Sequence, residues 1–280
     1  MLLAIDIGNT QTVLGLFEGD ELRHTWRLAS DTARTSDELK AIVTQLFHEA
    51  GKEQKLSLAA EHLVDKVIIA SVVPALTQVW ITLTQDLSYI KPATSTLVVD
   101  SKVAARYSMR SSNPAEAGAD RIANAVAASR LYATPAIVLD FGTATNIDVV
   151  DSDGNYSGGI ISPGLQTSAD ALFNSAARLP TLDLEVPKKV LGTTTKTAVQ
   201  SGLLYGEAAK VSTLIKALQD ENPQFSASDI PIIATGGLAP LIVPLIAAVT
   251  HSDEHLTLRG LQIISADAVD TEHSREAVHV

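Results

Sequence analysis

The feature that most constrains the fold is a pattern that occurs twice: an apolar run, then Asp-x-Gly, then polar residues. Residues 2–20 read LLAIDIGNTQTVLGLFEGD, and residues 136–154 read AIVLDFGTATNIDVVDSDG. Asp6 and Asp140 hold the same place in the two copies, 134 residues apart. Each apolar run has the length of a buried strand, and strand-like segments follow both. The pattern predicts a duplicated βββαβα unit, although two β-hairpins that merely share Gly-rich turns would look similar.

The segments that follow each repeat complete the predicted units. In the first half they are a hairpin with its turn at Gly19-Asp20, a helix over 36–51 with Ser36 as N-cap, a strand within DKVIIASVVP, a helix from Pro74 and a strand over 95–100. The second half opens with a helix that has Asn113 as N-cap, Pro114 first and Glu116 third. The order then repeats, with strands over 136–141, 144–151, 156–162 and 231–237 and a helix after Gly237. This order predicts an α/β protein with mixed sheets. We expect domains over 1–112 and 113–265 and a solvated tail over 266–280.

Composition excludes several classes of function. The 280 residues include no cysteine, which excludes disulfides, thiolate metal sites and cysteine nucleophiles. The net charge of −11 argues against binding to nucleic acid or anionic membranes, because phosphate groups would repel the chain. The start of the chain lacks the features of a signal peptide, and no apolar stretch is long enough to span a membrane. A cytoplasmic enzyme is therefore expected.

The first loop, DIGNTQT, has the residues of a phosphate-binding turn. Gly8 allows a ligand to approach the backbone closely, and the polar residues Asn9 to Thr12 add side-chain donors. Asp6, at the end of the strand, could hold a hydrated Mg²⁺ through water. The alternative is that Asp6 and Asn9 only satisfy the turn, as such residues often do.

The second loop, DFGTAT, repeats this arrangement. Asp140 again follows a buried strand, where an unpaired carboxylate would be costly, so we expect a cation or a hydrogen-bond donor beside it. Thr143 and Thr145 could donate to phosphate oxygens. Asp140 could equally do no more than accept hydrogen bonds from neighbouring backbone groups.

A third motif, NPAEAGADR, places Asp120 and Arg121 near the start of a helix, where anions are favoured. Asp120 could accept a proton from a substrate hydroxyl, and Arg121 could hold a substrate carboxylate. A structural alternative is a helix-stabilising Asp beside a solvated Arg.

Two further stretches are less specific. ATGGLA, residues 234–239, permits the close approach of a flat group such as adenine, or is simply a tight turn. GTTTKTAVQSG, residues 192–202, is not a Walker A loop, because Thr195 stands where that motif needs Gly; its threonines are donors or helix N-caps. The seven histidines show no metal-ligand spacing, and HSDEH at 251–255 is predicted to be a solvated turn.

Taken together, the motifs resemble those of type III pantothenate kinases. They are DIGNTQT, SVVP, NPAEAGADR, DFGTATNIDVV, GGIISPGL, TTKTAVQSG and ATGGLA, and the resemblance covers about residues 1–265. It implies the duplicated ribonuclease H-like fold of the superfamily that includes actin, hexokinase and acetate kinase, with a cleft between two mixed-sheet domains. It also implies transfer of the ATP γ-phosphate to pantothenate, giving 4'-phosphopantothenate in the first step of coenzyme A synthesis.

The resemblance also implies a role for each matching residue. The ATP phosphate loop would comprise Asp6, Ile7, Gly8, Asn9, Thr10, Gln11, Thr12 and Val13, and Thr143 would also bind ATP. Pantothenate would contact Gly118, Ala119, Asp120, Arg121 and Thr195, with Asp120 as the proton acceptor. Asp140 would bind K⁺ or NH₄⁺, and the protein would be a homodimer.

Three positions depart from the usual family pattern. Ser111 stands where many members have a Tyr that lines the substrate pocket, Asn146 replaces a Thr, and GTTT replaces Gly-Lys-Asn-Thr before the helix. We therefore assign no substrate contact to Ser111. The alternatives to a pantothenate kinase are another kinase of the superfamily and a non-enzymatic nucleotide-binding regulator.

Overall fold

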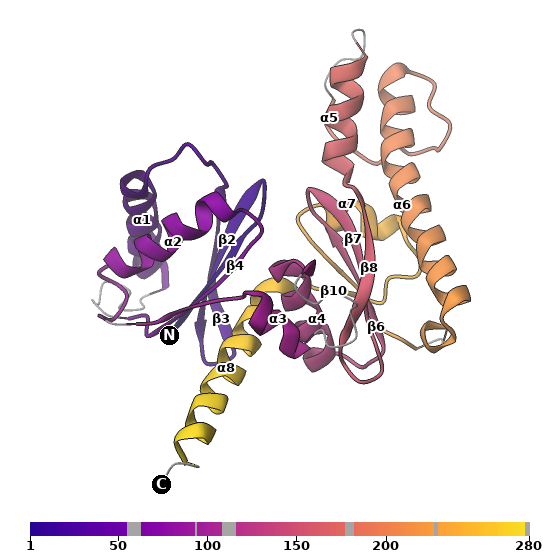
Figure 1. Ribbon diagram of the computed structural model, residues 1–280. Coiled ribbons are helices and arrows are strands. Elements are labelled where there is room, and N and C mark those ends of the chain that lie inside the picture. The colour runs from indigo at the N-terminus through magenta and orange to yellow at the C-terminus, as the bar shows by residue number, and fades with distance from the viewer. Residues whose placement is uncertain (55–62, 93, 108–115, 177–181, 227–228, 278–280) are drawn as a thin grey trace. The chain divides into compact units, whose positions relative to one another are not determined.

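The computed structural model describes residues 1–54, 63–92, 94–107, 116–176, 182–226 and 229–277 (Figure 1). These residues form two compact units. Unit 1 contains the described residues of 1–127 together with 257–277, and unit 2 contains those of Ala128–Leu256. This division differs from the predicted boundary after residue 112, because residues 116–127 and the last helix both belong to unit 1.

Unit 1 is built on a mixed five-stranded sheet. Its strands are β1 (Leu2–Ile7), β2 (Gln11–Glu18), β3 (Glu21–Ala29), β4 (Lys66–Ser71) and β5 (Thr96–Val98), in the order β3-β2-β1-β4-β5. Strand β1 lies antiparallel to β2 and parallel to β4, so Ile7 is opposite both Thr12 and Ser71. The central strand is almost entirely apolar and buried, as expected for a strand that is covered on both faces.

Five helices contribute to unit 1, the first of them with a cap that differs from the prediction. They are α1 (Ser36–Gln54), α2 (Pro74–Asp86), α3 (Ser101–Tyr107), the first part of α4 (Ala119–Leu131), and α8 (Leu256–Ala277). Thr35, and not Ser36, caps α1: its Oγ1 accepts from the Glu38 amide at 3.3 Å, and its own amide donates to Glu38 Oε2 at 2.8 Å. Helix α1 also continues past Gly51, its predicted end.

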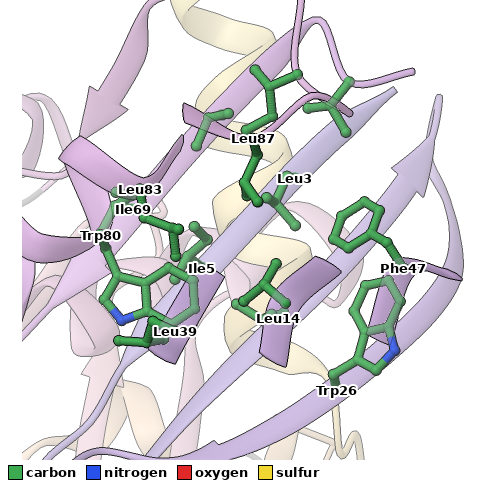
Figure 2. Close-up of a cluster of buried hydrophobic side chains, with 14 of the residues drawn as sticks. Leu3, Ile5, Leu14, Trp26, Leu39, Phe47, Ile69, Trp80, Leu83 and Leu87 are labelled. Atoms are coloured by element: carbon green, nitrogen blue, oxygen red, sulfur yellow. The ribbon is translucent and has the colours of Figure 1, made fainter. Parts of the chain in front are cut away.

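The core of unit 1 is aromatic where α1 meets the sheet. Figure 2 shows Phe47 of α1 beside Trp26 of β3, and the two rings stack with their centroids 4.9 Å apart. Leu14, Leu3 and Ile5 from the two central strands lie in the same cluster. This apolar packing anchors the strands whose ends carry the first loop.

Helix α8 is an integral part of unit 1. Thr257 donates to Asn124 of α4 at 2.8 Å, and Gln262 donates to Asp20 of the β2–β3 turn at 2.7 Å. Gly260 faces the backbone of Ala123 so closely that a side chain would not fit. The helix continues through 266–277, where a solvated tail was predicted.

Helix α4 begins later than the sequence predicted. Asn113 and Pro114 lie outside the described residues, and Glu116 precedes the helix, which begins at Ala119. The proposed start at Pro114 was therefore wrong. The prediction that Asp120 and Arg121 lie near a helix start, just after Gly118, is confirmed.

Unit 2 repeats the sheet of unit 1. Its strands are β6 (Ala136–Phe141), β7 (Ala144–Val150), β8 (Tyr156–Pro163), β9 (Ile232–Thr235) and β10 (His251–Ser252), in the order β10-β9-β6-β7-β8. Strand β6 is antiparallel to β7 and parallel to β9, as β1 is to β2 and β4. The duplication that the two Asp-x-Gly segments predicted is confirmed.

The helices of unit 2 are α5 (Leu165–Ser175), α6 (Thr195–Glu221) and the short α7 (Ala239–Ile242), with 3₁₀ turns at Pro223–Phe225 and Val243–Leu245. Helices α5 and α6 run side by side (Figure 1). Leu204, Val211 and Ile215 of α6 join the apolar face of the sheet that contains Leu139 and Ile147. In the part of the chain that the structure describes, no helix is both long and apolar enough to cross a membrane.

Candidate functional site

The first predicted loop is a tight, exposed turn at the end of β1. The Gly8 amide donates to the Gln11 carbonyl at 3.0 Å, which closes the turn. Asn9, Thr10 and Gln11 are exposed, Asp6, Gly8 and Val13 are half-buried, and Ile7 is buried. The turn therefore presents polar side chains to solvent directly after a buried strand, as a phosphate-binding loop requires.

Thr12 takes a different place from its neighbours in this loop. Its side chain is 1% exposed. Its Oγ1 is 2.9 Å from Ser30 Oγ, and the Ser30 amide donates to the Thr10 carbonyl at 3.0 Å. The Thr12 hydroxyl thus ties the loop to the end of β3, and its side chain is not presented to a ligand.

The start of α4 lies at the same end of the unit 1 sheet as Asp6. Val72, which follows β4, donates its amide to the Ile7 carbonyl at 3.0 Å. A methyl group on Gly118 would lie 3.7 Å from Val72 Cγ1 and only 2.5 Å from Asp120 Oδ1. The Asp120 carboxylate therefore folds back over Gly118, beside the carboxyl ends of β1 and β4.

The surroundings of Asp120 make its carboxylate a stronger base than usual. Burial raises its pKa, and this effect outweighs the Arg121 amide, which donates to Oδ1 at 2.8 Å, and the nearby Arg121 charge, both of which lower the pKa. A carboxylate with a raised pKa holds an accepted proton more firmly. This property suits a general base.

The second predicted loop lies at the equivalent end of the unit 2 sheet. The Gly142 amide donates to the Ala144 carbonyl at 3.0 Å, Asp140 is half-buried, and the Thr143 side chain is exposed. The Thr143 carbonyl accepts from the Gly164 amide at 3.2 Å and from Thr167 Oγ1 at 2.6 Å. Helix α5 thus begins directly against this loop.

The motif ATGGLA meets the same loop from β9. Gly236 has φ +92°, and a methyl group on it would lie 2.6 Å from both Asp140 Oδ1 and the Phe141 carbonyl. The Leu238 amide donates to that carbonyl at 3.1 Å. Only glycine fits here, because the backbone conformation and the space both exclude a side chain. The structure therefore brings DFGTAT, SPGL and ATGGLA together within unit 2.

Thr145 is not a phosphate donor, in contrast to the sequence interpretation. It is 1% exposed, and its Oγ1 donates to Glu207 Oε1 of α6 at 2.7 Å. The alternation of β7 carries the signal for this: Thr145 shares a sheet face with Ile147 and Val149, which lie in the core. Glu207 and its ion-pair partner Lys210, 2.7 Å away, lie outside all of the sequence motifs.

Thr195 is the first residue of α6, and its side chain is exposed. Thr194 is the N-cap and Thr197 completes a capping box with it. The reading of these threonines as N-caps is thus confirmed for Thr194, whereas Thr195 remains open to solvent. In HSDEH, Asp253 is 7% exposed and accepts from Tyr132 Oη at 3.2 Å, so this turn is not simply solvated.

The side-chain atoms that the carboxylates of the two loops offer to a cation are oxygens, the ligands that Mg²⁺ and K⁺ prefer. Among the described residues, no cluster of three or more His, Asp or Glu side chains could enclose a metal ion. Single carboxylates such as Asp6 and Asp140 fit a cation that keeps water or phosphate oxygens as its other ligands.

The chain matches known proteins along most of its length. A family model for Type III pantothenate kinase matches residues 2–217. A type III pantothenate kinase of Moorella thermoacetica is 43% identical over 265 residues, which cover 94% of this chain and 98% of that protein.

Two solved structures share the fold. One is a Campylobacter jejuni protein described as a Baf family transcriptional activator, with TM-score 0.57 and 18% identity over 96% of this chain and 99% of that one. The other is the activator of a 2-hydroxyisocaproyl-CoA dehydratase from Clostridium difficile, with TM-score 0.50 and 11% identity over 100% of this chain and 97% of that one. Both structures therefore share the two-unit α/β fold of this chain. The chain belongs to the type III pantothenate kinase family and is a phosphotransferase.

Proposed function

We propose that this protein transfers the γ-phosphate of ATP to the primary hydroxyl of pantothenate, giving 4'-phosphopantothenate, with Asp120 as the general base. Family membership supports the substrate and the donor. The observation that carries the mechanism is the Asp120 carboxylate, which has a raised pKa and lies at the same end of the unit 1 sheet as the DIGNTQT loop.

Asp120 would orient the hydroxyl and accept its proton late in the transfer, because phosphoryl transfer leaves little other covalent chemistry to the protein. The absence of a side chain at Gly118 leaves room for the Asp120 carboxylate itself, since a methyl group there would lie 2.5 Å from Oδ1. Arg121, the next residue on α4, would hold the pantothenate carboxylate or balance the charge of Asp120.

The phosphates would be held by the first loop, through half-buried Gly8 and the exposed Asn9 to Gln11, and by Thr143 in unit 2. A hydrated Mg²⁺ at Asp6 and K⁺ or NH₄⁺ at Asp140 would neutralise charge on the phosphates when bound. The half-buried carboxylates at the two strand ends support this assignment. The ATGGLA motif, which contacts Asp140, would receive the adenosine.

We further propose a homodimer in which Thr195 contacts pantothenate. The exposed position of Thr195 supports this, as do Val190 and Leu191, which precede it and are 65% and 80% exposed. Apolar side chains exposed to this extent are typical of protein interfaces. Light scattering at several protein concentrations tests the dimer, and a strictly monomeric protein would contradict it.

An ADP-release assay with pantothenate as the only acceptor tests the proposed function. It should be run in K⁺ and in Na⁺, with activity expected in K⁺. ADP release that requires a sugar in place of pantothenate would favour another kinase of the superfamily. Nucleotide binding without turnover on any acceptor would favour a regulator.

A further inference from the structure

Helix α6 carries an ion pair, next to the second loop, in which the carboxylate is buried and the lysine is half-buried. Glu207 is 6% exposed, although it carries a carboxylate. It accepts from Thr145 Oγ1 at 2.7 Å, and Lys210 Nζ lies 2.7 Å from its other oxygen. All these groups belong to unit 2.

The pair contacts β7, which follows the loop, and β8, which pairs with β7. Glu207 holds Thr145 near the start of β7, and Lys210 Nζ donates to the carbonyl of Pro163, the last residue of β8, at 3.1 Å. Pro163 lies opposite Ala144 in the sheet. The next amide, that of Gly164, donates to the Thr143 carbonyl. One helix therefore contacts the start of β7, which follows Thr143, and the end of β8, next to the amide that binds the Thr143 carbonyl.

Stability alone is a weak reason for such a pair. The other buried residues on this part of α6 include Leu204, Ala208 and Val211, and an apolar residue at 207 would extend the same face. The Glu207 carboxylate loses its hydration on burial, and the attraction to Lys210, whose side chain is 31% exposed, need not offset that cost. The ion pair does, however, specify one arrangement of the groups that it contacts, the Thr145 hydroxyl and the Pro163 carbonyl.

We infer that Glu207 and Lys210 are positioning residues that hold the Asp140–Thr143 loop in the geometry needed to bind ATP. The inference rests on the proposed function, since it concerns the loop that would bind the nucleotide. Helix α6 begins at Thr195, the proposed pantothenate contact, and reaches the nucleotide loop through Thr145. The binding of ATP, and not the binding of pantothenate, depends on the contacts of Glu207.

Substitution Glu207→Gln tests this, because the amide keeps the size of the side chain but loses the ion pair with Lys210. Calorimetric titration with MgATP should show a Kd raised on the order of tenfold. The KM for pantothenate at saturating ATP should change by less than about twofold, since the loop is selectively affected. The matched control is Asp220→Asn, which breaks the exposed Lys216–Asp220 pair of the same helix and should leave both values unchanged.

A second pair of variants separates positioning from folding. Thr145→Val removes the donor to Glu207 and should weaken MgATP binding, whereas Thr145→Ser keeps the hydroxyl and should restore it. Unchanged MgATP affinity in folded Glu207→Gln would overturn the inference, as would failure of both Glu207→Gln and Thr145→Val to fold. A wild-type protein that binds MgATP but transfers nothing to pantothenate would overturn the proposed function alone.

Discussion

The two Asp-x-Gly loops occupy equivalent places but are held in different ways. In unit 1, Ile7 pairs with Thr12, and the Gly8 amide closes the turn on Gln11. In unit 2, Phe141 pairs with Thr145, so this turn is one residue shorter, and the Gly142 amide closes it on Ala144. The first loop is exposed along its polar residues, whereas the Thr143 carbonyl of the second is anchored by the start of α5.

The matching threonines show the difference most clearly. Thr12 and Thr145 are both 1% exposed, and each follows the Asp-x-Gly turn of its own unit. Thr12 pairs with the neutral hydroxyl of Ser30, whereas Thr145 donates to the charged Glu207. A hydrogen bond to a charged group is stronger than one between neutral groups. The two strand ends are thus alike, whereas the second loop is held through a charged group and the first through a neutral one.

The largest expected effect concerns Asp120, whose carboxylate lies at the start of α4, at the same end of the sheet as the first loop. Asp120→Asn keeps the shape of the side chain but cannot accept the proton, so turnover should fall on the order of 10²-fold or more. Steady-state kinetics with pantothenate measure this. Asp86→Asn, at the exposed end of α2, removes the same charge and should keep normal turnover. Near-normal turnover in Asp120→Asn would remove Asp120 from the role of base.

A glycine at the second loop should matter more than one in a hairpin of unit 1. Gly236→Ala places a methyl group against Asp140 and Phe141 at φ +92°, and should lower the free energy of unfolding by about 3 kcal/mol. Gly19→Ala has φ +60° but nothing within 4 Å, and should cost about 1 kcal/mol. Urea unfolding of both variants measures the difference. Equal losses would show that the contact with Asp140 adds nothing.

The two threonines provide the next comparison. Thr145→Val leaves Glu207 without its hydroxyl donor and should cost about 2 kcal/mol of stability. Thr12→Val removes a neutral hydroxyl pair and should cost about 1 kcal/mol. Unfolding curves of the two variants test whether the second loop is held more firmly. A larger loss at Thr12 would reverse the comparison.

The sequence predicted the two repeats but not the side chains that hold their loops in place. A buried strand that ends in Asp-x-Gly can be recognised from neighbouring residues alone. Its two occurrences were therefore enough to predict the two sheets. The partner of Thr145 could not be found in this way, because Glu207 lies 62 residues away and is charged. The alternation of Thr145 with Ile147 and Val149 did indicate a buried face, although not the group that it meets.

Helix ends were predicted least well, for physical reasons. Thr35 and Ser36 are both good N-caps, and only the reciprocal bonds with Glu38 distinguish them. The segment 266–277 is rich in charged residues and resembles a solvated tail, but Glu, Arg and Ala also favour helix, and Leu258, Leu261 and Ile264 anchor the turns before it.

The smallest expected effect is a pH dependence of stability. It tests whether the Asp120 carboxylate lowers the free energy of unfolding. Burial raises the pKa of Asp120 in the folded state, so the folded protein holds this proton more tightly than the unfolded chain does. The stabilisation from protonation is complete below the ordinary Asp pKa, about 3.9, and is lost as the pH rises through the folded-state value. Above the folded-state pKa the buried carboxylate is charged and destabilising. Asp120→Asn should therefore be more stable than the wild type above that pKa, and this advantage should shrink as the pH falls towards 4. Urea unfolding across this range, with Asp86→Asn as the control for charge, measures it; a variant less stable than the wild type above that pKa would show that Asp120 supports the fold and not only the reaction.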